Sequence, residues 1–223
     1  MNPYDDLANS VIFKIKKNKI SVKNKDSRLE QIGAGRSAVV FKIKNTNKAL
    51  KVFFPPHEHI AQEEAEIYQQ LQGNSHYPKL YGSGKNYIVI DYIKGFTFFE
   101  CITKGIRIKE SYIAEADEAL LEARKAGLTP SDVHLRNIIL TPEKKIKLID
   151  VARFKQTNGC KQWEDLKKAY DIFYTKKFFP KRIPAFWLNQ IANLYNKGFL
   201  RPSNMQMKRK PFVSTENRIK KSS

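Results

Sequence analysis

Hydrophobic and polar residues follow two different periods along the chain, and the change falls near residue 100. Before it, short alternating apolar stretches around one helical stretch predict strands: VVFKIK, ALKVFF, LYGSG and YIVIDY. After it, apolar residues recur mostly at helical spacing, interrupted by one predicted hairpin, NIILTPEKKIKLID. A β-rich half followed by an α-rich half predicts an α+β fold with two lobes, residues 30–95 and 96–200, and a ligand site between them.

The segments outside these lobes, residues 1–29 and 201–223, are strongly basic and are expected to flank the compact middle. Residues 11–28 hold seven Lys and Arg against Asp26 alone, and VIFKIKKNKISVKN predicts two short strands around a polar turn. Residues 201–223 hold seven Lys and Arg against Glu216 and show no apolar period, so we expect a flexible basic tail.

Composition limits the class of protein. With 41% hydrophobic and 28% charged residues among 223, the chain can bury a sizeable core. No apolar run reaches the roughly 18 residues of a membrane span, and two acids near the start argue against a signal peptide. Cys101 and Cys160 are too few for a disulfide scaffold and lack zinc-site spacing. These observations favour a cytoplasmic protein.

The net charge is the main anomaly in the composition. Lys and Arg number 41 against 22 Asp and Glu, which gives +19. Such an excess favours an anionic partner: a nucleotide, a nucleic acid, an acidic protein or a membrane surface. The charge does not choose among these partners, and a general compositional bias toward lysine explains part of it equally well.

A glycine-containing segment, Ile32–Val40, lies between two predicted strands. Glycines allow a backbone to approach a polyphosphate and to present N–H groups to it. A dinucleotide-binding fingerprint would place a helix after the glycines, whereas the alternating sequence VVFKIK predicts a strand. By itself the segment fits an ordinary hairpin turn as well as a phosphate-binding loop.

One cation and one carboxylate stand at predicted apolar positions. Lys51 is surrounded by apolar residues in ALKVFF, and at about 100° per residue Glu64 falls inside the apolar stripe of the helix predicted from Ile60 to Leu71. A carboxylate buried without a partner costs several kcal/mol. We therefore predict that Glu64 pairs with Lys51, while a surface lysine and a half-exposed helix edge remain the alternatives.

Oxygen-bearing side chains bracket the predicted hairpin. Asp132 and Asn137 lie five residues apart in the loop before it, and Asp150 ends its return strand. Amide and carboxylate oxygens at the ends of adjacent strands can share a hard cation such as Mg²⁺. A further carboxylate nearby can orient a hydroxyl for attack.

Taken together, these residues resemble the motif set of the protein kinases. The segment Gly33-x-Gly35-x-x-Ala38-x-Val40 is similar to the glycine loop, Lys51 to the phosphate-binding lysine and Glu64 to the glutamate of the first helix. Asp132-x-x-x-x-Asn137 resembles the catalytic loop, and Asp150-Val151-Ala152 stands in place of Asp-Phe-Gly. The resemblance covers roughly residues 30–175 and is closest to compact bacterial serine/threonine kinases, with the RIO and lipopolysaccharide-core kinases more distant.

The resemblance implies ATP and Mg²⁺ as cofactors and assigns roles to the residues. Lys51, Glu64 and Asp132 would be catalytic, and Asn137 and Asp150 would hold the metal. Ile90 would be the gatekeeper beside the hinge. The full set implied to bind the nucleotide is Gly33, Ala34, Gly35, Ala38, Val40, Lys51, Ile90, Asp91 and Tyr92.

The departures from the family pattern also matter. Pro130 and Ser131 replace the His-Arg pair before the catalytic aspartate, so control by an activation-loop phosphate is not expected. His134 stands where protein kinases usually place a lysine, and a hydrogen-bonding role in the loop is favoured over metal binding. Only twelve residues separate Asp150 from Trp163, too few for an ordinary activation segment with a peptide platform.

Two helices are predicted at the end of the second lobe. The first should turn Trp163, Leu166, Tyr170, Phe173 and Tyr174 inward, and its Asp165 could bond either the catalytic loop or its own helix N-terminus. The second, from Pro184 to Tyr195, carries an aromatic and aliphatic stripe that we expect to be core rather than a base-stacking surface.

Three functions therefore stand at the sequence level. The first is an Mg·ATP-dependent kinase for serine or threonine in an unidentified protein. The second changes the acceptor to a sugar or another small molecule. The third is a non-catalytic pseudokinase or RNA-associated module that uses the basic flanks for an anionic partner.

Overall fold

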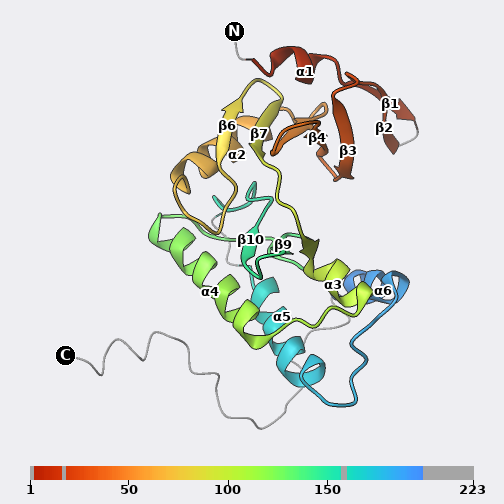
Figure 1. Cartoon of the computed structure of the whole chain (residues 1–223), viewed down its shortest axis with the longest axis vertical. Coiled ribbons are helices and arrows are strands. Elements are labelled where there is room, and N and C mark those ends of the chain that lie inside the picture. Colours follow the sequence, from red (N-terminus) through yellow and green to blue (C-terminus); the bar gives the residue numbers. More distant parts are fainter. Residues whose placement is uncertain (1–2, 17–18, 157–159, 198–223) are drawn as a thin grey trace, which may run out of the picture.

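The computed structural model describes residues 3–16, 19–156 and 160–197, and the predicted basic tail 201–223 lies outside this part of the chain. Its fold is mixed α and β (Figure 1), as the sequence predicts. The strands of the first half are β1 (Ile12–Lys16), β2 (Lys19–Asn24), β3 (Leu29–Ala34), β4 (Ala38–Ile43), β5 (Lys48–Phe53), β6 (Leu80–Ser83) and β7 (Tyr87–Asp91). They are accompanied by helices α1 (Asp5–Asn9) and α2 (Ile60–Gln70).

The second half is mostly helical. It contains α3 (Phe98–Lys104), α4 (Glu110–Lys125), α5 (Gln162–Ala169), a π-helical turn (Tyr170–Tyr174) and α6 (Ala185–Asn196). Three short strands, β8 (Phe96–Thr97), β9 (Ile138–Leu140) and β10 (Ile146–Leu148), form a sheet in the order β10-β9-β8. The predicted hairpin is β9–β10, whereas β8 was not expected from the sequence.

The main sheet is antiparallel, with strand order β3-β4-β5-β7-β6. Its register places Val40 opposite Lys51, and Lys51 opposite Ile88, across three adjacent strands. Directly opposite residues of antiparallel strands share one face of a sheet. The lone lysine therefore lies on the face that also carries Ala49 and Ile90, and this face packs against α2 and the second half of the chain.

The other face of the sheet is covered by the N-terminal segment. Leu7, Ala8 and Val11 are buried with the sheet residues Phe41, Leu50, Val52 and Val89, and the β1–β2 hairpin packs against the same cluster. The two strands predicted around a polar turn are confirmed as β1 and β2. Residues 1–29 were expected to be a flank, but part of this segment contributes to the core. Its few apolar residues are buried because they cover one face of the main sheet.

Packing against the β9–β10 hairpin leaves no room for a side chain at Gly95, which lies between β7 and β8. Its φ is +153°, and an added Cβ would lie 2.4 Å from the Leu140 carbonyl oxygen. Thr97 then caps α3: its hydroxyl accepts from the Glu100 N–H, while the Glu100 carboxylate accepts from the Thr97 N–H. The connection from the sheet to the helices is therefore tightly defined.

The expectation for the last helix was wrong. Leu188 is buried, but the exposed fractions are 63% for Phe186, 60% for Trp187, 47% for Ile191 and 42% for Leu194. In the preceding helical segment Trp163 and Tyr174 are buried as predicted, whereas Phe173 is 37% exposed. The apolar period correctly placed these residues on helix faces, but a period does not supply a neighbouring element to cover a face.

Among the described residues, no helix combines the length and the apolar character that crossing a membrane would require. Both cysteines are free thiols, Cys101 buried and Cys160 exposed.

Candidate active site

The ion pair predicted between Lys51 and Glu64 is present. Lys51 comes from the middle of β5 and Glu64 from the inner face of α2, and Lys51 Nζ lies 2.9 Å and 2.7 Å from Oε1 and Oε2 of Glu64. The Glu64 side chain is fully buried and that of Lys51 is 10% exposed. The alternatives of a surface lysine and a half-exposed helix edge are therefore excluded.

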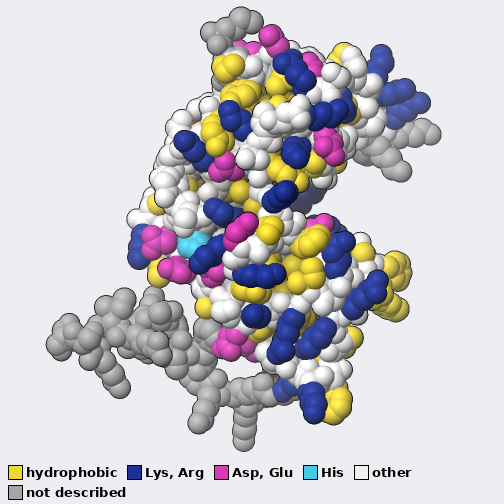
Figure 2. Space-filling view, viewed as in Figure 1, with side chains coloured by type: hydrophobic (Ala, Val, Ile, Leu, Met, Phe, Trp, Pro, Cys, Tyr) yellow, Lys and Arg dark blue, Asp and Glu magenta, His cyan; other side chains and the backbone are white. Residues whose placement is uncertain are grey.

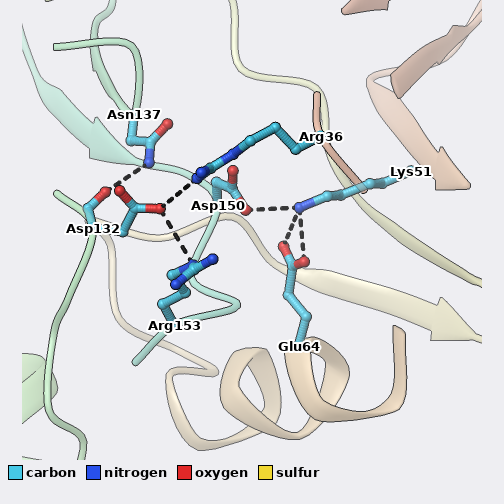
Figure 3. Close-up of polar contacts among 7 residues, drawn as sticks. All are labelled: Arg36, Lys51, Glu64, Asp132, Asn137, Asp150 and Arg153. Atoms are coloured by element: carbon cyan, nitrogen blue, oxygen red, sulfur yellow. Dashed lines mark hydrogen bonds and ion pairs between the residues drawn. The ribbon is translucent and has the colours of Figure 1, made fainter. Parts of the chain in front are cut away.

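Asp150 completes a three-residue cluster around the ammonium group. Its Oδ1 lies 2.8 Å from Lys51 Nζ, and its side chain is 50% exposed (Figure 3). The cluster joins one residue of the main sheet, one of α2 and one that follows β10. Asp150 is the member that faces solvent, so it is the carboxylate that an approaching ligand can reach.

Burial and charge shift the pKa values of this cluster in different directions. Burial raises the pKa of Glu64 to about 7, although Lys51 acts against this shift. Burial alone would lower the pKa of Lys51, but the two carboxylates raise it above its ordinary value. The Lys51 ammonium lowers the pKa of Asp150 below 3.8. Lys51 and Asp150 are therefore both charged at neutral pH.

The loop that carries Asp132 and Asn137 is held from two sides. The Phe99 N–H of α3 donates to the Leu135 carbonyl, and the Ile149 N–H donates to the Asn137 carbonyl, both at 2.9 Å. Within the loop, Asn137 Nδ2 donates to the Asp132 carbonyl at 3.0 Å. This bond fixes the amide plane, so the amide oxygen of Asn137 is turned away from Asp132 (Figure 3).

Two aspartates of the site have a backbone conformation that L-residues rarely adopt. The φ values of Asp132 and Asp150 are +58° and +62°. This left-handed region costs about 1 kcal/mol or more for a non-glycine residue and is found repeatedly at functional sites, where surrounding contacts hold it. Here Asp132 lies in the loop before β9, and Asp150 lies just beyond Ile149, whose N–H donates to the Asn137 carbonyl of that loop.

Sequence reasoning did not single out two arginines that contact Asp132. Arg36, in the turn between β3 and β4, and Arg153, three residues after Asp150, each place a guanidinium nitrogen 3.4 Å from Asp132 Oδ2. Arg36 belongs to the glycine-containing segment and Arg153 directly follows Asp150-Val151-Ala152. Their positions inside two motifs were the available signal.

The residues implied to bind a nucleotide lie in or beside the strands β3, β4, β5 and β7 of the main sheet, and the register places Val40, Lys51 and Ile90 on one face but Ala34 and Asp91 on the other. Gly33 and Ala34 end β3, Ala38 and Val40 begin β4, and Gly35 lies in the turn, where its N–H donates to the Ala38 carbonyl at 2.8 Å. Ile90 and Asp91 end β7, with Ile90 buried. The Tyr92 N–H donates to the Asn47 carbonyl, so the segment after β7 is tied to the β4–β5 turn.

The segment after Asp150 is anchored by contacts that involve no phosphorylated residue. The Thr129 N–H donates to the Phe154 carbonyl at 2.6 Å, and Thr129 forms a parallel bridge with Lys155. Lys155 Nζ also lies 2.7 Å from Glu66 Oε2, on the outer side of α2. An exposed ion pair contributes little to stability, but this one joins the segment to the helix that carries Glu64.

His134 and Asp165 take structural roles. His134 Nδ1 accepts the Arg136 N–H at 3.3 Å, and burial lowers the pKa of its imidazole, in keeping with the predicted hydrogen-bonding role. Asp165 Oδ2 accepts from the Tyr195 hydroxyl at 2.8 Å, a contact that neither of the two sequence alternatives anticipated. Within the described residues, no group of three or more His, Cys, Asp or Glu side chains is arranged to hold a metal ion.

Comparison with known proteins finds relatives that are named as kinases. No family profile matches the chain. A Bacillus subtilis (strain 168) protein, named "Putative serine/threonine-protein kinase YrzF", is 48% identical over 206 residues, which are 92% of this chain and 96% of the relative. The "Probable serine/threonine-protein kinase CA_C1728" of Clostridium acetobutylicum is 29% identical over 146 residues, 58% of this chain and 22% of that protein. The chain therefore belongs to the serine/threonine-protein kinase family.

Proposed function

We propose that the chain transfers a phosphoryl group from Mg·ATP to a serine or threonine hydroxyl of a protein. The observation that carries the proposal is the convergence of the Glu64 and Asp150 carboxylates on the Lys51 ammonium group, whose Nζ lies 2.7 Å from Glu64 Oε2 and 2.8 Å from Asp150 Oδ1. Lys51 would bind the α- and β-phosphates, and Glu64 would hold its ammonium in place. The sheet-rich and helical halves would be the two lobes of a kinase, with the nucleotide between them.

Gly33, at the end of β3, and Gly35, in the β3–β4 turn, support a phosphate-binding role. A glycine in an ordinary hairpin turn usually supplies a positive φ, but neither Gly33 nor Gly35 is among the glycines with one. An added Cβ would also meet only ordinary contacts, at 3.9 Å and 3.6 Å respectively. The fold itself therefore does not require glycine at either position, whereas close approach of a polyphosphate to the backbone does.

The donor set fits magnesium bound together with a triphosphate. Mg²⁺ commonly takes one or two protein carboxylates and completes its shell with water and phosphate oxygens, so three protein ligands are not needed. The half-exposed Asp150 carboxylate and the Asn137 amide oxygen would hold the ion. When bound, the ion neutralises charge on the phosphates, which is the chemistry it supplies in phosphoryl transfer.

Asp132 would orient the acceptor hydroxyl and accept its proton. Its side chain is 28% exposed, and it lies in the loop that also carries Asn137. Asn137, which would bind the metal, donates to the backbone carbonyl of Asp132, so the two residues are tied together within the loop. Catalysis would then consist mainly of positioning and charge neutralisation.

The test is transfer of radiolabelled γ-phosphate by the full chain onto itself, onto casein-like proteins and onto sugars. We expect label on serine or threonine of protein, and a loss of at least about 100-fold for each of Lys51→Ala, Asp132→Ala and Asp150→Asn. Glu63→Ala, which removes an exposed carboxylate from the same helix as Glu64, is the matched control.

The outcomes separate the candidate functions. Near-wild-type rates in all three site variants would overturn the proposal. Label on sugars alone would replace the protein acceptor with a small molecule. Nucleotide binding is tested independently by the shift in unfolding temperature with Mg·ATP, because a ligand that binds the folded state raises that temperature.

A further inference from the structure

The two arginines beside Asp132 are not needed to hold the fold. The Arg36 side chain is 82% exposed and that of Arg153 is 51% exposed. Exposed pairs at 3.4 Å contribute little to stability. They nevertheless approach one carboxylate from two segments far apart in the sequence, the β3–β4 turn and the segment after Asp150 (Figure 3).

The contacts immediately around Asp132 carry an excess of positive charge. The Lys51 ammonium group contacts two carboxylates, Glu64 and Asp150, so it has no positive charge to spare. Arg36 and Arg153 share the single carboxylate of Asp132, so two positive charges face one negative charge. A guanidinium carries five N–H donors, and each arginine directs one nitrogen to Asp132, which leaves donors for a further anion.

We propose that Arg36 and Arg153 bind an anionic group, carboxylate or phosphate, that lies beside the acceptor hydroxyl. This inference rests on the proposed function, because it takes Asp132 as the residue that receives the hydroxyl. An anion held by both guanidinium groups draws them away from Asp132 Oδ2. Binding of the anionic acceptor then frees the Asp132 carboxylate, which must accept the proton of the acceptor hydroxyl.

The charge of the whole chain cannot substitute for this pair. The net charge of +19 favours every anionic peptide, and Figure 2 shows basic side chains over both halves of the molecule. A test of specific recognition must therefore compare protein variants that have the same net charge. Arg28 and Lys44 allow this, since both are exposed and lie at the end of the β3–β4 hairpin opposite to Arg36.

The experiment measures binding, not phosphoryl transfer. Fluorescence anisotropy would give the affinity of the full chain with Mg·ADP for four labelled peptides, in which serine is flanked on both sides by Glu, phosphoserine, Gln or Lys. The proteins are wild type, Arg36→Gln/Arg153→Gln and the charge-matched control Arg28→Gln/Lys44→Gln. Thermal unfolding of each protein verifies that the variants fold.

We expect the Glu or phosphoserine peptide to bind wild type and control about tenfold more tightly than the Gln peptide, since charge-assisted hydrogen bonds are the strong ones. In the arginine variant this ratio should fall toward one. The stronger of the two anionic peptides identifies carboxylate or phosphate as the natural group. Equal affinities in wild type, or an unchanged ratio in the arginine variant, would overturn the inference.

The experiments distinguish a failure of the proposed phosphoryl transfer from a failure of the proposed anion site. If the chain transfers no phosphate but the arginine pair still discriminates the peptides, the proposed function fails while the anion site stands. If transfer occurs and Arg36→Gln/Arg153→Gln weakens only Mg·ADP binding, the arginines serve the nucleotide and the acceptor inference is wrong.

Discussion

Lys51 and Asp150 are 99 residues apart in the chain, yet Lys51 Nζ lies 2.8 Å from Asp150 Oδ1. This contact joins the main sheet to the segment that follows the β9–β10 hairpin. A cation from an early strand and an acid from a late loop thus face the same space. Every role proposed for the site depends on that convergence.

The contact predicts a pH-dependent contribution to stability. Because Lys51 lowers the pKa of folded Asp150 below 3.8, the ionised carboxylate stabilises the folded state at pH values above the unfolded pKa. That contribution is lost as the pH falls through the folded pKa. Urea unfolding at several pH values should therefore show the stability difference between wild type and Asp150→Asn shrinking from pH about 5 to 3. A difference independent of pH would refute this.

Removal of Glu64 should destabilise the chain strongly. Glu64→Ala leaves the buried Lys51 ammonium with Asp150 as its remaining partner, and we expect a loss of about 3 kcal/mol in the free energy of unfolding. Glu63→Ala changes the neighbouring, exposed carboxylate of α2 and should cost less than about 0.5 kcal/mol. Urea titration measures both, and equal losses would contradict the buried ion pair.

The exposed face of α6 can be tested by fluorescence, because the chain has only two tryptophans. Trp163→Phe leaves Trp187, which is 60% exposed, and its emission should be quenched readily by acrylamide. Trp187→Phe leaves Trp163, which is 5% exposed and donates to Asp117, and quenching should be several-fold weaker. Equal protection of both indoles would show that the α6 face is covered.

Gly95 should tolerate no side chain. Gly95→Ala combines a strained φ of +153° with a Cβ 2.4 Å from the Leu140 carbonyl oxygen, and we expect a loss of at least about 2 kcal/mol. Gly73→Ala is the control: its φ is +87°, but an added Cβ has nothing within 4 Å, so only the backbone cost of about 1 kcal/mol applies. Thermal unfolding of the two variants compares them, and a smaller loss at Gly95 would rule out the close packing of β8 against β9.

The sequence by itself determined the features that depend on local periodicity. Alternation predicted the strands of the main sheet, and the helical period placed Glu64 among apolar residues, so a buried partner was required. Because Lys51 was the cation at a predicted apolar strand position, the pair could be named before the structure. Motif order then related Asp132, Asn137 and Asp150 to one catalytic arrangement through family resemblance.

Only the tertiary structure decided which faces are covered and which side chains meet across the site. The same apolar period that is buried in α2 is exposed in α6, because burial depends on whether another element packs against the face. The N-terminal segment covers the sheet although its charge suggested a flank. Arg36 and Asp132 are 96 residues apart, and no local pattern encodes their contact, since only the folded backbone brings the two loops together.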